Sequence, residues 1–388
     1  MRSIELFSGA GGLALGLEKA GFESVAFFER NSDACATLKH NRPAWNIVES
    51  DVRDVDFSAF GPVDLVAGGP PCQPFSMGGK ARGFDDHRDM FPQAVRAVRE
   101  LSPRAFIFEN VRGLLRPAFR NYVEFIRLQL TYPEFPTSDS LDWETNLRRL
   151  ERHHNSRGSA KGLTYNVTLN LADAADYGVP QRRHRVFFVG FRSDVFSNWF
   201  FPRPTHSRSQ LLWAQHQTGR YWKEHGISLA EASVGGVVDQ AVLRHEPAEL
   251  IPTTERWRTV RDAIASLGDP CGPTRQKNHV FQSGARSYPG HTGSPLDEPA
   301  KALKAGDHGV PGGENMLRHA NGKVRYFSIR ESARIQTFPD DWEFPTSWSE
   351  SMRQLGNAVP VRLGMTVAAS VAAKLMAHAP TDCVQSAR

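Results

Sequence analysis

The chain has 388 residues, 40% of them hydrophobic, and a formal net charge of +5. This length fits one large α/β domain with a second, smaller lobe, and the modest positive charge permits nucleic-acid binding without requiring it. No apolar run reaches the ~18 residues of a membrane-spanning helix. No charged leader with an apolar block precedes the first predicted strand, so we expect a cytoplasmic protein with no membrane partner.

The cysteines lie far apart, at Cys35, Cys72, Cys271 and Cys383. They form no CxxC pair and no cluster with histidines at zinc-binding spacing. We therefore expect reduced thiols, no disulfide framework and no metal site.

Up to about residue 190, short runs rich in Val, Ile and Phe alternate with segments of 3.6-residue periodicity. The strand-like runs are residues 3–7, 24–29, 46–51, 63–69 and 105–110, and the clearest helical segments are 13–21 and 89–101. This alternation predicts βαβ units, hence an α/β fold with a doubly wound, mostly parallel sheet. Two β-rich runs within residues 165–191 predict antiparallel strands at the edge of the sheet.

The rest of the chain divides by composition. Residues 191–327 are rich in Pro, Gly, His, Arg and Trp with weak periodicity, which predicts a smaller irregular lobe after a first domain at 1–190. Clear helical patterning returns in residues 328–388. Residues 132–160, charged and containing a tryptophan, read as an insertion whose role the sequence does not indicate.

A glycine-rich turn follows the first predicted strand, in the segment ELFSGAGG of residues 5–12. Gly9, Gly11 and Gly12 fit a tight turn that brings the backbone close to a ligand at a helix N-terminus. Glu29 ends the second predicted strand and Asp51 the third, where an acid can bind a ribose. The pattern indicates an adenosine-type cofactor and leaves open whether it is a dinucleotide or S-adenosylmethionine.

Cys72 lies in the segment GGPPCQPFS, residues 68–76, past the end of the fourth predicted strand. Three prolines restrict this loop. A buried, inert cysteine is expected inside the apolar strand, so a proline-framed thiol at a strand end favours a nucleophile. Because a free thiol is only a few per cent thiolate at neutral pH, such a cysteine needs cationic or donor groups nearby.

The next predicted strand supplies an acidic side chain, and a later segment supplies two basic side chains. Glu109 and Asn110 end the run AFIFEN, and because neighbouring parallel strands end at one edge of a sheet, we expect Glu109 near Cys72. Arg183 and Arg185 lie two residues apart in QRRHR, on one predicted strand face. That pattern fits a solvated strand as well as a clamp on a base or phosphate.

With these residues in view, the chain resembles the DNA (cytosine-5)-methyltransferases of bacterial type over nearly its whole length. The segments FSGAGG, PPCQPFS, ENV, QRRHR, RESARIQTFP and GNAVP resemble the successive motifs of that family and occur in its order. The one minor departure is Glu5, where many members carry Asp. An acid remains there, so we expect no loss of function.

The resemblance implies a mechanism. Cys72 would attack C6 of a target cytosine, and Glu109 would protonate or hydrogen-bond N3. Arg183 and Arg185 would orient the base and the thiolate. The enamine formed would take the methyl group of S-adenosylmethionine at C5, and loss of the C5 proton with elimination of Cys72 would release 5-methylcytosine. Covalent addition at C6 fits this reaction, because C5 of cytosine is a weak nucleophile and the addition splits one difficult methyl transfer into two easier steps.

The resemblance also implies a Rossmann-like methyltransferase sheet that holds the cofactor, and a target-recognition domain at 191–327. Because its GNAVP motif helps to form the cofactor pocket, the C-terminal segment 328–388 is expected to rejoin the first domain. The cofactor-binding residues would be Phe7, Gly9, Gly11, Gly12, Glu29, Asp51, Pro71 and Asn357. The substrate would be double-stranded DNA with the cytosine flipped out of the helix. A nucleoid-associated prokaryotic enzyme of a restriction-modification system is expected, acting as a monomer, with a cognate endonuclease that need not bind it directly.

Three rival functions are open on the residues alone. An NAD-dependent dehydrogenase shares the glycine turn but has no use for Cys72 beside Glu109. A tRNA methyltransferase shares the catalytic motifs, and the long recognition region favours DNA over RNA. A non-catalytic DNA-binding homologue is disfavoured by the intact Cys72, Glu109 and Arg183. The target sequence cannot be derived from the loops.

Overall fold

The computed structural model describes residues 1–71, 89–138, 140–156, 162–195, 198–228, 254–273, 276–306 and 315–377. The chain divides into two compact units. The first comprises Met1–Ala172, His184–Pro202 and Leu363–Arg388, and the second comprises Asp173–Arg183 and Arg203–Arg362. The chain therefore passes between the units four times.

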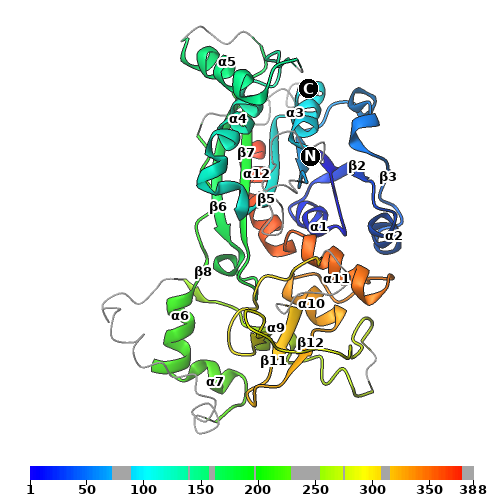
Figure 1. Ribbon diagram of the computed structural model, residues 1–388, viewed down its shortest axis with the longest axis vertical. Coiled ribbons are helices and arrows are strands. Elements are labelled where there is room, and N and C mark those ends of the chain that lie inside the picture. The colour runs from blue at the N-terminus through cyan, green and yellow to red at the C-terminus, as the bar shows by residue number, and fades with distance from the viewer. Residues whose placement is uncertain are drawn as a thin grey trace, which may run out of the picture. The chain divides into compact units, whose positions relative to one another are not determined.

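A seven-stranded sheet forms the centre of the first unit (Figure 1). Its strands lie in the order β3 (Ile47–Glu49), β2 (Glu23–Glu29), β1 (Arg2–Leu6), β4 (Leu65–Gly68), β5 (Ala105–Val111), β7 (His184–Arg192) and β6 (Tyr165–Asp173). The first five strands are mutually parallel, and β7 runs antiparallel to β5. The predicted mostly parallel sheet with an antiparallel edge is confirmed.

The strand order reverses between β1 and β4, which pair with Leu6 opposite Gly68. In open α/β sheets a ligand binds outside the carboxyl ends of the strands at such a point. Gly68 is needed there because a Cβ atom on it would lie 2.5 Å from the Leu6 carbonyl oxygen. The glycine turn and the segment before Cys72 thus leave the sheet side by side.

Helices of the first unit pack against the sheet or, for the helix of residues 143–155, against a neighbouring helix. They are α1 (Gly12–Lys19), α2 (Ser32–Asn41), α3 (Phe91–Leu101), α4 (Arg120–Thr131), α5 (Trp143–Asn155) and α12 (Val361–Ala377). One core cluster joins alternate strand residues such as Ile4, Leu6 and Phe108 to the buried faces of α3 and α4. Short 3-10 turns complete the unit at Val52–Asp54, Phe57–Phe60, Arg112–Leu115 and Pro117–Phe119.

Helix α12 returns to the N-terminal part of the chain, as predicted. Gly364 contacts Leu13, and a Cβ atom on Gly16 would lie 2.7 Å from the Met365 nitrogen and 2.8 Å from the Gly364 carbonyl carbon. By length and composition alone, the stretch Trp348–Ala377, which contains α11 and α12, could cross a membrane, yet 56% of its apolar 18-residue window is buried inside the protein. Such burial is typical of a core helix.

We expect Gly16→Ala to lower the free energy of unfolding by about 1–3 kcal/mol, because the added methyl group meets backbone atoms that cannot rotate away. Denaturant unfolding measures the change. The exposed Lys19→Ala in the same helix is the control and should change the stability by less than about 0.5 kcal/mol. Equal stabilities for wild type and Gly16→Ala would contradict the close α1–α12 contact.

The insertion at 132–160 contains a helix that packs on the first unit. Leu147 and Leu150 of α5 are buried, and the Trp143 ring lies edge-on to Tyr122 of α4. Asp142 caps the helix by accepting a hydrogen bond from the Thr145 N–H. The insertion is therefore folded against α4.

The second unit has short elements. They are β8 (His206–Ser207), α6 (Arg208–Leu212), a π-helical turn (Trp213–Gln217), α7 (Arg220–Glu224), β9 (Glu255–Arg256), α9 (Val260–Ile264), β10 (Ser294–Pro295), β11 (Met316–Arg318), β12 (Val324–Tyr326), α10 (Ile329–Ile335) and α11 (Trp348–Asn357), with a 3-10 turn at Ala174–Tyr177. Strands β10 and β11 are parallel, and β11 and β12 are antiparallel.

The unit boundaries differ from the predicted domain boundaries. Residues 328–362, expected to rejoin the first domain, belong to the second unit, where Arg330 of α10 donates its backbone N–H to the Asn278 carbonyl. Residues 191–202 belong to the first unit, because Trp199 packs there and donates a hydrogen bond to Ser370 of α12. The domain functions stay predictions.

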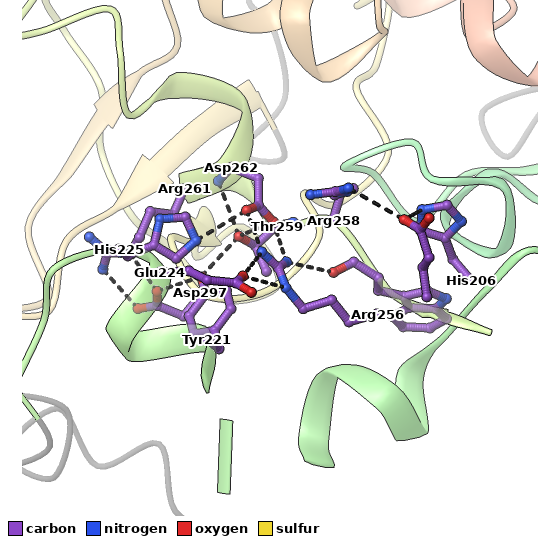
Figure 2. A network of polar contacts seen from close by, with 12 residues as sticks. His206, Tyr221, Glu224, His225, Arg256, Arg258, Thr259, Arg261, Asp262 and Asp297 are labelled. Atoms are coloured by element: carbon purple, nitrogen blue, oxygen red, sulfur yellow. Dashed lines mark hydrogen bonds and ion pairs between the residues drawn. The ribbon is translucent and has the colours of Figure 1, made fainter. Parts of the chain in front are cut away.

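A polar network holds the second unit together around Arg256 (Figure 2). Its guanidinium contacts Glu224 at 2.9 Å and Asp262 at 2.7 Å, and lies over the Tyr221 ring. Asp262 also forms a capping box with Thr259 at the start of α9. Glu224 belongs to α7 and Arg256 to β9, so these contacts join two elements that are distant in the sequence.

The environment of His206, which lies in the same network, predicts that the free energy of unfolding depends on pH. Burial and the nearby Arg362 lower the pKa of His206 to about 4, although the Glu255 carboxylate opposes this. An unfolded histidine titrates near pH 6.5, so the unfolded chain binds more protons between pH 6.5 and 4. The free energy of unfolding should therefore fall by roughly 3 kcal/mol as the pH drops through this range.

Denaturant unfolding at pH 7 and pH 4.5 tests this, with His206→Gln as the comparison. The variant should lose less stability than the wild type between the two pH values. If both lose the same amount, another group is responsible for the pH dependence.

Candidate active site and cofactor site

Glu109 and Arg185 form a buried ion pair at the carboxyl end of β5. Arg185 Nε lies 2.5 Å from Glu109 Oε1, and the two side chains are 10% and 8% exposed. In the antiparallel pairing Arg185 stands opposite Val111, two residues from Glu109, which places both side chains on one face of the sheet. Burial lowers the pKa of Arg185, while the charge of Glu109 raises it. Each charge thus depends on the other for compensation.

The chain that leaves β4 touches the same end of β5. A Cβ atom on Gly69 would lie 3.3 Å from Glu109 Oε2, and the Asn110 amide donates a buried hydrogen bond of 3.0 Å to the Pro70 carbonyl. The Pro71 carbonyl accepts a hydrogen bond from the Met90 N–H. Gly69 therefore lies beside Glu109, and the predicted proximity of Cys72 to Glu109 stays a prediction. Cys72 itself lies outside the described residues.

The glycine turn is a strained segment. Phe7 has a φ of 56°, Gly9 of 52° and Gly11 of 88°, and a positive φ is unusual for a residue as bulky as phenylalanine. Among the residues that the structure describes, no atom lies within 4 Å of a Cβ atom built on Gly9, so these residues leave space on that side of the turn. Strain that the surrounding structure maintains at a sheet edge is typical of a ligand site.

Glu29 fixes this turn to the end of β2. Its carboxylate accepts a hydrogen bond from the Gly9 N–H at one oxygen and from the Asn31 N–H at the other, both at 2.8 Å. A carboxylate has further lone pairs, so Glu29 keeps acceptor capacity for a ribose hydroxyl. The predicted ligand acid therefore also positions the backbone that would meet the ligand.

The comparisons with known proteins agree with this geometry. The family model described as C-5 cytosine-specific DNA methylase matches residues 1–132 and 151–373. The chain belongs to this family. The Type II methyltransferase M.PspPI of Psychrobacter sp. (strain TA137) is 33% identical over 386 residues, covering 98% of this chain and 80% of the relative. The Type II methyltransferase M.NgoMIV of Neisseria gonorrhoeae is 33% identical over 362 residues, covering 92% of this chain and 93% of the relative.

Solved structures show the same fold. The DNMT2 mutant of Spodoptera frugiperda aligns with a TM-score of 0.55 and 18% identity, covering 97% of this chain and 99% of that one. The Dnmt2 methyltransferase of S. pombe aligns with a TM-score of 0.54 and 17% identity, covering 97% and 98%. At these identities the likeness concerns the fold. The family model leaves out residues 133–150, which include the first half of α5.

S-adenosylmethionine is the cofactor of this cytosine-5 methyltransferase. The residues present fit it: a strained turn open on one side and a carboxylate fixed at the end of β2. Asp51 is more fully engaged, because Arg53 donates to both of its oxygens and the hydrogen bonds lower the pKa of Asp51 to about 2. A bond from Asp51 to adenine stays a prediction.

Glu5, the minor departure from the family pattern, has an unusual environment in the structure. It is 1% exposed in β1, and its Oε2 atom has no hydrogen-bond partner among the described residues. Burial and the charge of Glu29 raise the pKa of Glu5 well above its ordinary value, although the Ala14 N–H opposes this. A carboxyl group in an apolar strand, two residues before the glycine turn, was the signal available in the sequence.

Arg183 differs from Arg185 in its contacts. Strand β7 begins at His184, so the expectation that both arginines lie on one strand face is wrong. Arg183 belongs to the second unit, where its guanidinium donates to the backbone carbonyls of Leu303 and Gly356. Asn357 is exposed at the end of α11 in the same unit. The catalytic role of Arg183 and the cofactor role of Asn357 stay predictions.

Proposed function

We propose that this cytosine-5 methyltransferase modifies one short sequence in double-stranded DNA, as the modification enzyme of a Type II restriction-modification system. The names of the curated relatives support this, since they are Type II methyltransferases. The single structural observation behind it is the meeting of the Cys72 loop, through Gly69 and Pro70, with Glu109 and Asn110.

In the proposed reaction the cytosine leaves the duplex and enters the site between these residues. Cys72 Sγ bonds to C6, and the electron pair displaced from the C5–C6 bond is stabilised by Glu109 at N3. Arg185, now paired with Glu109, orients the ring. Bound S-adenosylmethionine supplies the methyl group that is added at C5. Loss of the C5 proton then expels Cys72 and restores the aromatic ring.

The cofactor would lie against the glycine turn, along Phe7, Gly9, Gly11, Gly12, Glu29, Asp51 and Pro71, with Asn357 closing the pocket. The second unit, with most of residues 191–327, would recognise the target. We further propose a cytoplasmic, nucleoid-associated monomer whose cognate endonuclease acts at the same sequence without binding it.

We expect Glu29→Gln to weaken S-adenosylmethionine binding about tenfold or more, because a neutral amide loses charge-assisted bonds to the ribose and to the Gly9 N–H. Calorimetric titration measures the dissociation constant. Glu23→Gln, at the exposed start of the same strand, is the control and should bind normally. Unchanged affinity in Glu29→Gln would exclude this carboxylate from the cofactor site.

A cytosine-methylation map of DNA from a methylation-free host that expresses this chain tests the function as a whole. Methylation confined to one short sequence context is expected. A folded chain that binds S-adenosylmethionine but leaves DNA unmodified, and methylates RNA in a parallel assay, would contradict the choice of polymer.

A further inference from the structure

Three arginines follow strand β5 at intervals of four residues. Arg112 begins the 3-10 turn after β5, Arg116 links this turn to the next, and Arg120 begins α4. All three are exposed. We call them the arginine row.

None of these guanidinium groups forms an ion pair or a side-chain hydrogen bond with any part of the chain that the structure describes. Other arginines of the chain, by contrast, are paired with acids. Examples are Arg96 with Glu100, Arg127 with Glu124 and Arg325 with Glu331. The charges of the arginine row are therefore not compensated by neighbouring carboxylates among the described residues.

The arginine row does not stabilise the local fold. Buried Leu114 and Phe119 anchor the segment, at 0% and 5% exposure, and leave the arginines on its outer side. Arg120 occupies the first turn of α4, where the helix dipole disfavours a positive charge by a few tenths of a kcal/mol or more. A role in stability does not explain a cation at that position.

The row begins beside the candidate active site. Arg112 directly follows Val111, which pairs with Arg185, and stands three residues after Glu109. A cytosine that meets Glu109 stays attached to its sugar and phosphates. The strand that carries it must therefore pass this edge of the sheet.

We propose that Arg112, Arg116 and Arg120 bind phosphates of the DNA strand that carries the target cytosine. This rests on the proposed function. A guanidinium can bind a phosphate through two parallel hydrogen bonds, and such contacts fix the register of a protein on DNA without reading its sequence. The row thus holds the backbone on one side of the flipped nucleotide.

The test is the salt dependence of duplex binding. Each phosphate contact contributes about 0.9 to the slope of log K against log salt, so R112Q/R116Q/R120Q should lower the slope by roughly 2.7. The KM for duplex DNA should rise in this variant, because its phosphate contacts are lost. The lysine triple variant keeps the charges and should retain most of the slope.

The matched control is R148Q/R149Q/R152Q on α5. It removes the same charge from the same unit, at arginines that likewise form no ion pair with described residues. An equal change of slope in both glutamine variants would show a general charge effect and overturn the proposal. If the wild-type chain methylates DNA and R112Q/R116Q/R120Q has the same salt slope as the wild type, the proposal is overturned as well. A wild-type chain that neither binds nor methylates duplex DNA would contradict the proposed function itself.

Discussion

Cys72→Ala should lower the rate of DNA methylation by at least about 10⁴-fold while leaving S-adenosylmethionine binding intact. The proposed bond to C6 activates C5, and no other described side chain at the ends of β4 and β5 offers a thiol in its place. Single-turnover methylation of a duplex containing the mapped target measures the loss.

The control for this variant is Cys35→Ala, because Cys35 is a buried cysteine of α2 whose thiol contacts the Glu29 carbonyl. Burial raises the pKa of the Cys35 thiol to about 12, so it stays protonated and unreactive. Cys35→Ala should keep nearly full activity. Wild-type turnover by Cys72→Ala would exclude the covalent mechanism.

Glu109→Gln should lower kcat by about 10²–10⁴-fold, with a much smaller effect on cofactor affinity. The amide cannot supply a proton to N3, and it also leaves the buried Arg185 without its counter-charge. Single-turnover rates and cofactor titrations on the same preparation separate chemistry from binding.

A second variant separates the two effects of Glu109→Gln. Arg185→Lys keeps a cation beside Glu109 but loses the planar guanidinium, so it tests orientation with the acid intact. Both variants should be folded at 25 °C in the assay buffer, which denaturant unfolding checks. If Glu109→Gln were fully active while folded, the acid would have no role at N3.

The positions of the strands could be predicted from the sequence because each strand of a parallel sheet is a short apolar run ending in a turn signal. The same rule brought Glu109 to the exit of β4, since it needs only strand adjacency. The ion pair between Glu109 and Arg185 could not be derived, because it depends on the register of an antiparallel pair joined across 76 residues of chain.

Other features depend on packing, which periodicity does not report. The backbone strain at Phe7, the double attachment of Glu29 and the buried carboxyl of Glu5 each require the three-dimensional surroundings of the turn. For Arg183 the sequence pattern led to a wrong expectation. Its spacing from Arg185 suggested a shared strand face, but the strand begins only after it, and its guanidinium is directed to backbone carbonyls.

The return of α12 to α1 has a consequence for synthesis on the ribosome. The first unit contains residues from both ends of the chain, and the partners of Gly16 are made about 350 residues later. Until then Leu13, which is 4% exposed in the finished protein, lacks its neighbour Gly364. The nascent chain must keep this apolar surface from other chains for most of its elongation time, roughly 20–80 s at bacterial rates.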